Sequence, residues 1–248
     1  MLTIYILWLR QLKRYFRSPS RLIGAFGQPL LFLVALGFGF GPIFQKAGGG
    51  SYIMFLTPGI IAQSVLFTSI FSGVEIIWDR QFGFLKETLV APVSRLNIMI
   101  GRTLGGATVA TIQGLIVLGL SFFVGFRLYN IISLPLAIVF IILEALLFTA
   151  LGTAIASVLE DIHGFQLIMN FLVMPIFFLS GALFPLQGLP PIINTFTLIN
   201  PLSYAVDAIR GSLTGISHFG LATDFIVLTI VTGILLTIGS YLFSKIQI

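Results

Sequence analysis

Long apolar stretches dominate this sequence and constrain its fold more than any other feature. A helix needs about 20 apolar residues to cross the ~30 Å hydrocarbon core of a bilayer, and six stretches reach that length: about 22–44, 52–77, 99–126, 134–158, 166–186 and 222–244. Lipid offers the backbone no hydrogen-bonding partners, so these stretches should be helices, and the alternation typical of membrane β-strands is absent. The sequence therefore predicts an all-α integral membrane protein with six transmembrane helices.

The composition supports lipid as the main solvent of the chain. Of its 248 residues, 57% are hydrophobic and only 8% are charged, whereas soluble domains average roughly 25% charged residues. A fold surrounded by water could not cover so much apolar surface. The chain has no cysteine, which excludes a disulfide framework.

Basic residues mark one side of the membrane. Ten of them lie near span ends on the side of the amino terminus: Arg10, Lys13, Arg14, Arg17, Arg21, Arg80, Lys86, Arg95, Arg102 and Lys245. The other side has only Lys46, Arg127 and Arg210. Because Lys and Arg accumulate on the cytoplasmic side, both termini are expected in the cytoplasm of a multi-pass cell-membrane protein. This clustering at span ends favours membrane orientation over nucleic-acid binding.

Residues 1–21 have the pattern of an amphipathic cytoplasmic helix. Four arginines fall on one helical stripe, at positions 10, 14, 17 and 21. A neighbouring stripe is aromatic and aliphatic: Tyr5, Trp8, Leu12 and Tyr15. We expect an interfacial helix on the cytoplasmic leaflet, and the alternative is a simple basic anchor.

The stretch "RQFGFLKETLVAPVSR", residues 80–95, is a charged insert between two apolar stretches. Phe82, Leu85 and Leu89 share one helical face, and the helix should end before Pro92. A short amphipathic helix over about 79–95 would suit a groove on another protein, and the alternative is a solvated cytoplasmic turn. The remainder of the chain, 22–248, is expected to form one transmembrane domain around this insert.

The segment at about 187–221 is too apolar for an ordinary loop. Pro190-Pro191 and Asn200-Pro201 resemble helix starts, which predicts two short external helices that re-enter or lie on the membrane before the last span. Asp207 and Arg210 are spaced to pair on the second of these helices.

Polar residues inside the spans are candidates for a substrate path or a dimer seam. Ser64, Thr68 and Ser72 form a stripe with Glu75 at its end, Gln166 and Asn170 are four residues apart, and Glu144 lies near the middle of the fourth span. Small hydroxyl residues also favour close helix packing, and Glu144 could instead make a structural hydrogen bond. Gly37 and Gly41, and likewise Gly101 and Gly105, match the GxxxG spacing of close helix contacts.

Enzyme motifs are missing. The sequence has no HExxH, no GxSxG and no P-loop, since no lysine is followed by Ser or Thr. We therefore expect no catalytic residues, no metal site and no ATP hydrolysis by this chain alone.

Three long stretches resemble the permease subunits of ABC-2 type transporters, most closely the daunorubicin-resistance (multidrug efflux) group. They are "YFRSPSRLIGAFGQPLLFLVALGFGFG", "FLTPGIIAQSVLFTSIFSGVEIIWDRQFGFLKETLVAPVSRLNIMIGRTLGG" and "FLSGALFPLQGLPPIINTFTLINPLSYAVDAIRG". Together they cover nearly the whole chain.

The resemblance implies six spans, cytoplasmic termini and a dimer bound to two copies of a separately encoded ABC ATPase, which would carry ATP and Mg. It also implies that the insert is a coupling helix docked on the ATPase, with matching residues Asp79, Arg80, Gly83, Leu85, Lys86, Glu87, Pro92 and Arg95. The loop "LEDIHGF", 159–165, would make a second contact, and its polar residues are Glu160, Asp161 and His163.

These features predict the homodimeric membrane permease of an ATP-driven exporter for a hydrophobic or amphipathic compound, either drug-like or lipid. Two alternatives stay open: export of a lipid-linked polysaccharide or lipid by the same architecture, and a non-transporting membrane partner of an ATPase.

Overall fold

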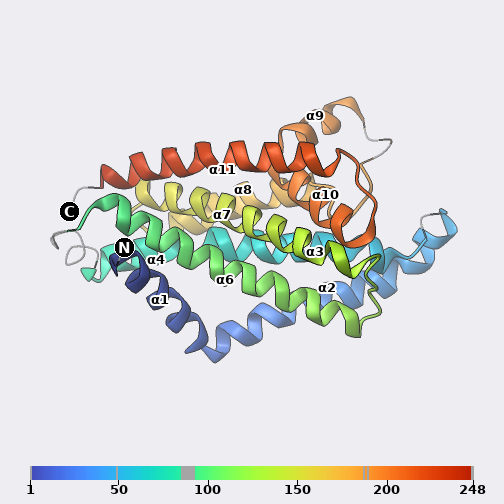
Figure 1. Cartoon of the computed structure of the whole chain (residues 1–248), viewed down its shortest axis with the longest axis horizontal. Coiled ribbons are helices and arrows are strands. Elements are labelled where there is room, and N and C mark those ends of the chain that lie inside the picture. Colours follow the sequence, from blue (N-terminus) through green and yellow to red (C-terminus); the bar gives the residue numbers. More distant parts are fainter. Residues whose placement is uncertain (1, 49, 85–92, 187, 189, 247–248) are drawn as a thin grey trace.

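The computed structural model describes residues 2–48, 50–84, 93–186, 188 and 190–246, with side chains throughout except at 19–23 and 25. Every regular element in these ranges is helical: α1 (Leu2–Phe16), α2 (Pro19–Lys46), α3 (Tyr52–Phe71), α4 (Val74–Gln81), α6 (Arg95–Phe123), η1 (Ile131–Ser133), α7 (Leu134–Val158), α8 (Ile162–Phe178), α9 (Pro191–Ile199), α10 (Pro201–Thr214) and α11 (Leu221–Ser244). The long helices run side by side as one bundle (Figure 1).

Five helical segments of the described chain are long and apolar enough to cross a membrane: Phe26–Lys46, Tyr52–Gln81, Arg95–Phe123, Ile131–Val158 and Leu221–Ser244. The predicted bounds of the fourth span, 134–158, agree with α7. The fifth predicted span, 166–186, is instead the 17-residue α8, which ends at Phe178. The chain turns soon afterwards, since Gly181 adopts φ 74° and its carbonyl accepts a hydrogen bond from Arg210 Nη2 at 2.9 Å. The residues expected to form the last turns of the fifth span therefore leave the helix and contact α10 instead.

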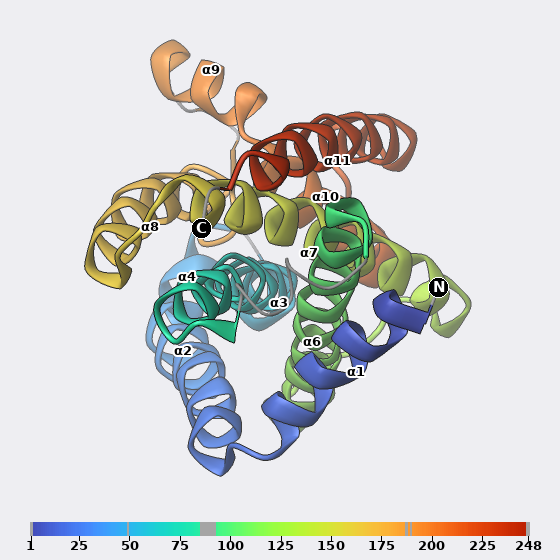
Figure 2. The same cartoon turned by 90° about the vertical axis from the view of Figure 1, so that its left-hand side faces the viewer.

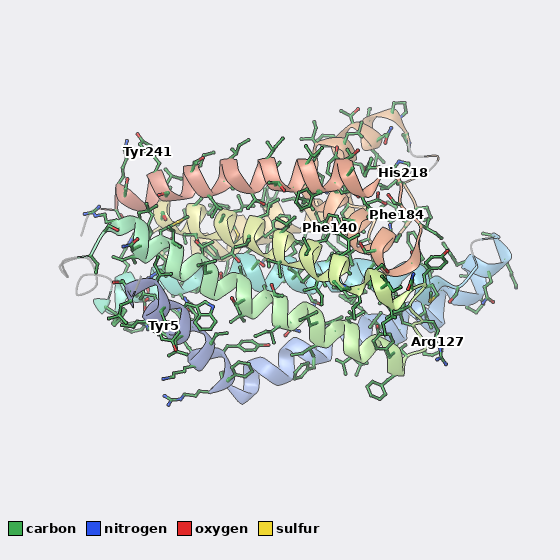
Figure 3. All side chains as sticks on the ribbon, viewed as in Figure 1. Tyr5, Arg127, Phe140, Phe184, His218 and Tyr241 are labelled. Atoms are coloured by element: carbon green, nitrogen blue, oxygen red, sulfur yellow. The ribbon has the colours of Figure 1, made fainter. Side chains whose placement is uncertain are left out.

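The two ends of the described chain lie at the same end of the bundle, together with α1, α4 and the start of α6 (Figure 1). We call this the basic end, after the cations that lie on α1, α4 and α6 or directly follow α1: Arg10, Lys13, Arg14, Arg17, Arg80, Arg95 and Arg102. Figure 3 shows Tyr5 and Tyr241 toward this end, and Arg127, Phe184 and His218 at the opposite end beside α9 and α10. The insert is thus flanked by helices on the same side as both termini.

Helix α7 lies at the centre of the bundle and packs against α3, α6, α10 and α11. Its Phe140 and Phe148 are buried with Ile60, Ile61 and Leu66 of α3. Close backbone contact needs glycine where α3 passes into α4, because a Cβ on Gly73 would lie 2.5 Å from the carbonyl oxygen of Gly152 on α7. This contact fixes the break between α3 and α4 against the bundle.

Helix α1 packs along the first half of α6. A Cβ on Gly101 would lie 3.0 Å from the Ile4 carbonyl oxygen, and one on Gly105 would lie 2.6 Å from Cγ of Gln11. The GxxxG pair therefore seats α1. Trp8 Nε1 also donates to Thr108 Oγ1 at 3.0 Å. The aromatic stripe that suggested a lipid surface is thus largely packed on protein.

Helix α1 is also shorter than the predicted 1–21. It ends at Phe16 and α2 begins at Pro19. Ser18, between them, has φ −111° and ψ 89°, because a residue before proline is pushed away from helical angles.

The prediction of one helix over 79–95 is wrong at both described ends. Asp79 and Arg80 belong to α4, Gly83 breaks the helix with φ 80°, and Arg95 is the first residue of α6. The Ser94 side chain caps α6 by accepting a hydrogen bond from the Asn97 amide at 3.3 Å.

Two short helices, α9 and α10, are present where two were expected, and the Asn200 side chain caps α10 through the Leu202 amide at 3.0 Å. The expected ion pair between Asp207 and Arg210 is not formed. Asp207 instead accepts hydrogen bonds from the amides of His218 and Phe219, each at 2.7 Å, and Arg210 binds the Gly181 carbonyl. Both charged groups are thus used to hold loops.

Candidate functional site

Three neighbouring cavities share lining residues and extend from the basic end into the bundle. The outer cavity, which we call the basic mouth, has a volume of about 680 Å³ and is lined by Ile6, Leu9, Arg10, Lys13, Arg14, Arg17, Trp78, Asp79, Phe82 and Phe84. The middle cavity, about 520 Å³, shares Trp78 with it and is lined by Gln11, Tyr15, Gln28, Phe67, Thr68, Phe71, Ser72, Val74, Glu75, Gly106, Val109 and Gln166. The inner cavity, about 60 Å³, shares Gln28, Phe67 and Thr68 with the middle one and adds Gly24, Pro29, Gln63, Ser64 and Gln113. We call the three together the polar cleft.

The polar cleft contains most of the polar stripe singled out in the sequence. Thr68, Ser72, Glu75 and Gln166 line the middle cavity, and Ser64 lines the inner one. Viewed from the basic end, α1, α2, α3, α4 and α6 are arranged around this region (Figure 2). The stripe therefore belongs to a cavity inside one chain, as well as to the packing of α3.

Helical hydroxyl groups make the stripe compatible with an apolar span. Ser64 Oγ donates to the Ile60 carbonyl at 2.9 Å, and Ser72 Oγ donates to the Ser69 carbonyl at 2.6 Å. Each donor is satisfied within its own helix, and the hydroxyl oxygen keeps lone pairs that can accept a hydrogen bond. When the cleft is empty, these hydroxyl donors are therefore already satisfied and cost little free energy. When a ligand is present, their oxygens can accept hydrogen bonds from its polar groups.

Two residues of the predicted path lie outside the polar cleft. Glu144 is 0% exposed, and neither of its carboxylate oxygens has a hydrogen-bond partner among the described residues. Asn170 is exposed on α8 and lines none of the three cavities. The structure thus separates these two residues from the stripe on α3.

Sequence reasoning missed five polar residues of the middle and inner cavities: Gln11, Tyr15, Gln28, Gln63 and Gln113. Tyr15 donates its hydroxyl to Gln113 Oε1 at 2.8 Å, and burial raises the pKa of the Tyr15 hydroxyl. Isolated glutamines inside apolar stretches, such as Gln28 and Gln113, were the signal that could have indicated this wall.

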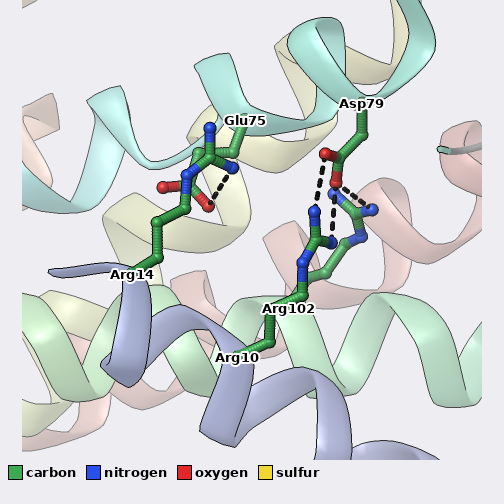
Figure 4. A network of polar contacts seen from close by, with 5 residues as sticks. All are labelled: Arg10, Arg14, Glu75, Asp79 and Arg102. Carbon is green, nitrogen blue, oxygen red and sulfur yellow. Dashed lines mark hydrogen bonds and ion pairs between the residues drawn. The ribbon is translucent and has the colours of Figure 1, made fainter. Parts of the chain in front are cut away.

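An ion-pair network joins α1, α4 and α6 at the basic mouth (Figure 4). Asp79 accepts two hydrogen bonds from Arg10, at 2.9 and 3.1 Å, and one from Arg102 Nη2 at 2.5 Å. Arg14 Nη1 lies 3.6 Å from Glu75 Oε2. Asp79 and Arg102 are almost fully buried, with side chains 7% and 3% exposed. The base of the insert is therefore fixed to two other helices.

Two further arginines of the insert bind the carboxyl ends of spanning helices. Arg80 donates to the Ser157 and Leu159 carbonyls at the end of α7, each at 3.1 Å. Arg95 donates to the carbonyls of Ser244 and Ile246 at the end of α11. A cation is favourable there because the last carbonyls of a helix lack partners and carry partial negative charge. Asp79, Arg80 and Arg95, predicted as docking residues, thus connect the insert to the bundle.

Phe82 is a strongly exposed apolar residue of the described insert, at 82%. The remaining predicted coupling residues, Leu85, Lys86, Glu87, Leu89 and Pro92, lie outside the described residues. Their docking role stays a prediction.

The second predicted contact lies next to α4. Gln81 Nε2 donates to the Glu160 carbonyl at 3.4 Å, and the Asp161 side chain caps α8 through the Gly164 amide at 2.6 Å. The side chains of Glu160 and His163 are exposed. The structure thus brings this loop beside the base of the insert.

Comparison with known proteins gives a consistent family. The model of the ABC-2 type transporter family matches residues 3–214. Nodulation protein J of Rhizobium leguminosarum bv. trifolii is 29% identical over 232 residues, covering 90% of this chain and 86% of the relative. The putative transport permease ycf38 of Cyanophora paradoxa is 30% identical, covering 84% and 72%. The inner membrane transport permease YadH of Escherichia coli K12 is 27% identical, covering 90% and 88%.

Proposed function

The chain belongs to the ABC-2 type transporter family and is the membrane permease subunit of an ABC transporter, and we propose that it exports a hydrophobic or amphipathic compound from the cytoplasm or the inner leaflet. Membership of the family implies partnership with an ABC ATPase. The proposed assembly is a homodimer with two ATPase copies, which carry the ATP and Mg that this chain has no motif to bind. Both termini and the basic end then face the cytoplasm, and α8 serves as a sixth span.

The observation that carries the proposal is the polar cleft. It begins at the basic end and extends inward along α3 as far as Ser64. Hydroxyl and amide groups alternate with Phe67 and Phe71 in its walls, which suits a ligand with polar groups on an apolar body. The size and chemistry of the cleft favour a drug-like compound or lipid, as in the daunorubicin-resistance group to which we assign the chain.

The contacts of Arg80 and Arg95 support a coupling role for the insert. Each guanidinium binds the last carbonyls of a spanning helix, and Asp79 ties the same region to α1 and α6. A displacement of the insert by the ATPase would therefore move α1, α6, α7 and α11 with it. An exposed Phe82 supplies an apolar group of the kind that anchors protein interfaces.

Thiol labelling can test the proposal directly, because the natural chain has no cysteine. Thr68→Cys would place a single thiol in the cleft, and Ile234→Cys would place a control thiol on the exposed surface of α11, outside the cleft. The complex with its ATPase is reconstituted in vesicles and treated with a membrane-impermeant maleimide from the side of the ATPase. We expect labelling at position 68 that falls when ATP and vanadate trap the closed ATPase, and little labelling at position 234.

Labelling at position 68 that ignores nucleotide would contradict a transport path through the cleft. If in addition no added amphiphile changed ATP hydrolysis by the complex, a non-transporting membrane partner would be the better description. Export of a lipid-linked saccharide predicts that such lipids, rather than drug-like compounds, accelerate hydrolysis.

A further inference from the structure

The basic mouth has an excess of positive charge that the described residues do not neutralise. Five cations surround it, namely Arg10, Lys13, Arg14, Arg17 and the buried Arg102, whereas two carboxylates, Glu75 and Asp79, lie among them. The cluster thus keeps a formal charge of +3. A concentration of like charge beside a cavity raises the local concentration of anions.

Two of these cations are available to a ligand. Lys13 and Arg17 are exposed and form no ion pair with any described residue. Lys13 is on α1 and Arg17 directly follows its last residue. The Arg17 amide donates to the Lys13 carbonyl at 3.1 Å, so the helical turn continues and places the two residues one turn apart on the same face. The other arginines are held in place: Arg10 by Asp79 and by the Phe84 ring, 3.8 Å from its guanidinium carbon, and Arg14 by Glu75.

Apolar surface continues directly from this charge. Ile6, Leu9, Trp78 and Phe82 line the same cavity, and Ile6 and Phe82 are exposed. The adjoining outer face of α1 adds the exposed Leu2, Tyr5 and Phe16. A soluble anion would leave this apolar surface in water, whereas an amphiphile would cover it with its chains.

We propose that the basic mouth binds the phosphate headgroup of an anionic phospholipid from the cytoplasmic leaflet. Lys13 and Arg17 contact the phosphate oxygens, and the acyl chains lie along the exposed Phe16 and the neighbouring face of α1. Basic residues beside apolar and aromatic ones at the end of a span are the arrangement by which membrane proteins hold anionic lipids. The proposal uses the orientation given under the proposed function and requires no transport.

The observations favour lipid over the acidic surface of a partner protein. The Tyr15 hydroxyl donates to Gln113, well inside the span formed by α6, so the end of α1 that carries Lys13 lies at the depth of the bilayer. A protein groove would have to follow it there. The exposed apolar residues on α1 are likewise suited to acyl chains.

Tryptophan quenching tests the site, because the chain has only two tryptophans and Trp78 lines the basic mouth. In a Trp8→Phe background, the full chain is placed in nanodiscs without ATPase, and brominated phosphatidylglycerol or brominated phosphatidylcholine is titrated in. Each basic contact is expected to change anionic-lipid binding by about fivefold. We therefore expect phosphatidylglycerol to quench at a mole fraction at least fivefold lower than phosphatidylcholine does.

The decisive variant is Lys13→Gln/Arg17→Gln, and its matched control is Lys46→Gln/Arg127→Gln, which removes the same charge at the opposite end of the bundle. The first pair should abolish the preference for phosphatidylglycerol, and the second should keep it. A preference that survives Lys13→Gln/Arg17→Gln overturns the proposal. So does equal quenching by the two lipids in the parent chain.

Two further measurements separate other ligands and do not depend on how well the variants fold. In the parent chain, raising the salt concentration should weaken the preference for phosphatidylglycerol, since exposed charges are screened; a salt-independent preference argues against the site. Inorganic phosphate at millimolar concentration should not restore Trp78 fluorescence, and full restoration would identify a soluble anion as the ligand.

A third measurement tests for a protein partner in place of a lipid. Loss of ATPase binding in Lys13→Gln/Arg17→Gln with unchanged lipid quenching would identify a protein partner and overturn the lipid assignment. If the lipid quenching is as expected but the complex transports nothing, the proposed export is refuted and the lipid site stands.

Discussion

Replacing Asp79 by alanine should destabilise the permease far more than replacing Arg10, its more exposed partner. The carboxylate is the partner of both Arg10 and Arg102. Arg102 has a side chain 3% exposed, and its Nε and Nη1 already have no hydrogen-bond partner in the described structure. Without Asp79, the guanidinium would keep its buried charge with no counterion.

The size of the effect follows from burial. Removing one partner of a buried pair costs about 3–5 kcal/mol because the remaining charge is left uncompensated. Arg10 is 34% exposed, and Asp79 retains Arg102 when Arg10 is removed. We therefore expect Asp79→Ala to cost about 3–5 kcal/mol, and Arg10→Ala to cost about 1 kcal/mol, as for a largely solvated pair.

The double variant Asp79→Ala/Arg102→Met should recover most of the loss, since apolar replacement of a whole buried pair is often neutral. The free energy of unfolding would be measured by SDS titration of the purified chain in mixed micelles, with tryptophan fluorescence as the signal. Glu160→Ala is the control: it removes an exposed acid near the same end and should change stability by less than about 0.5 kcal/mol.

Two results would refute the reasoning. One is a cost for Asp79→Ala below about 1 kcal/mol, the value for an exposed pair. The other is no recovery in the double variant, which would show that the uncompensated charge of Arg102 is not the source of the loss.

Two further substitutions test the packing and the coupling contacts. Gly73→Ala would place a Cβ 2.5 Å from the Gly152 carbonyl oxygen and should lower the unfolding free energy by about 1–3 kcal/mol; Gly233→Ala, with open space at its Cβ, should not, and equal behaviour of the two would contradict the close contact. Arg80→Ala removes both hydrogen bonds to the end of α7 and should reduce substrate-stimulated ATP hydrolysis while ATPase binding to the permease persists; unchanged stimulation would show that these contacts do not transmit motion.

Hydropathy alone predicted most of the helices, because the formation of an apolar helix in lipid depends on each residue and its near neighbours in the sequence. The sequence predicted α7 with its observed bounds, and it predicted helix starts at Pro191 and Pro201. Periodicity also placed Ser64, Thr68 and Ser72 on one face of a helix, and in the structure all three line the polar cleft. Their role in a substrate path stays a prediction.

Side-chain partners required the tertiary structure, since they come from helices far apart in the chain. Arg10 and Asp79 are 69 residues apart, and Arg80 and Leu159 are 79 apart. Nothing in the charge pattern of the insert indicated that its arginines bind helix ends inside the same chain. The early end of α8 has the same origin, because it depends on Arg210 binding the Gly181 carbonyl.

The sequence by itself determined that this chain is a bundle of lipid-soluble helices with its cations at one end, because hydropathy and charge are properties of each residue and its near neighbours. Only the tertiary structure decided that α1 packs on α6, that Glu144 is enclosed away from the cleft, and that Lys13 and Arg17 lie beside a cavity without an ion-pair partner among the described residues. Those outcomes depend on which helix faces pack together, and the same apolar stripes would have allowed other pairings.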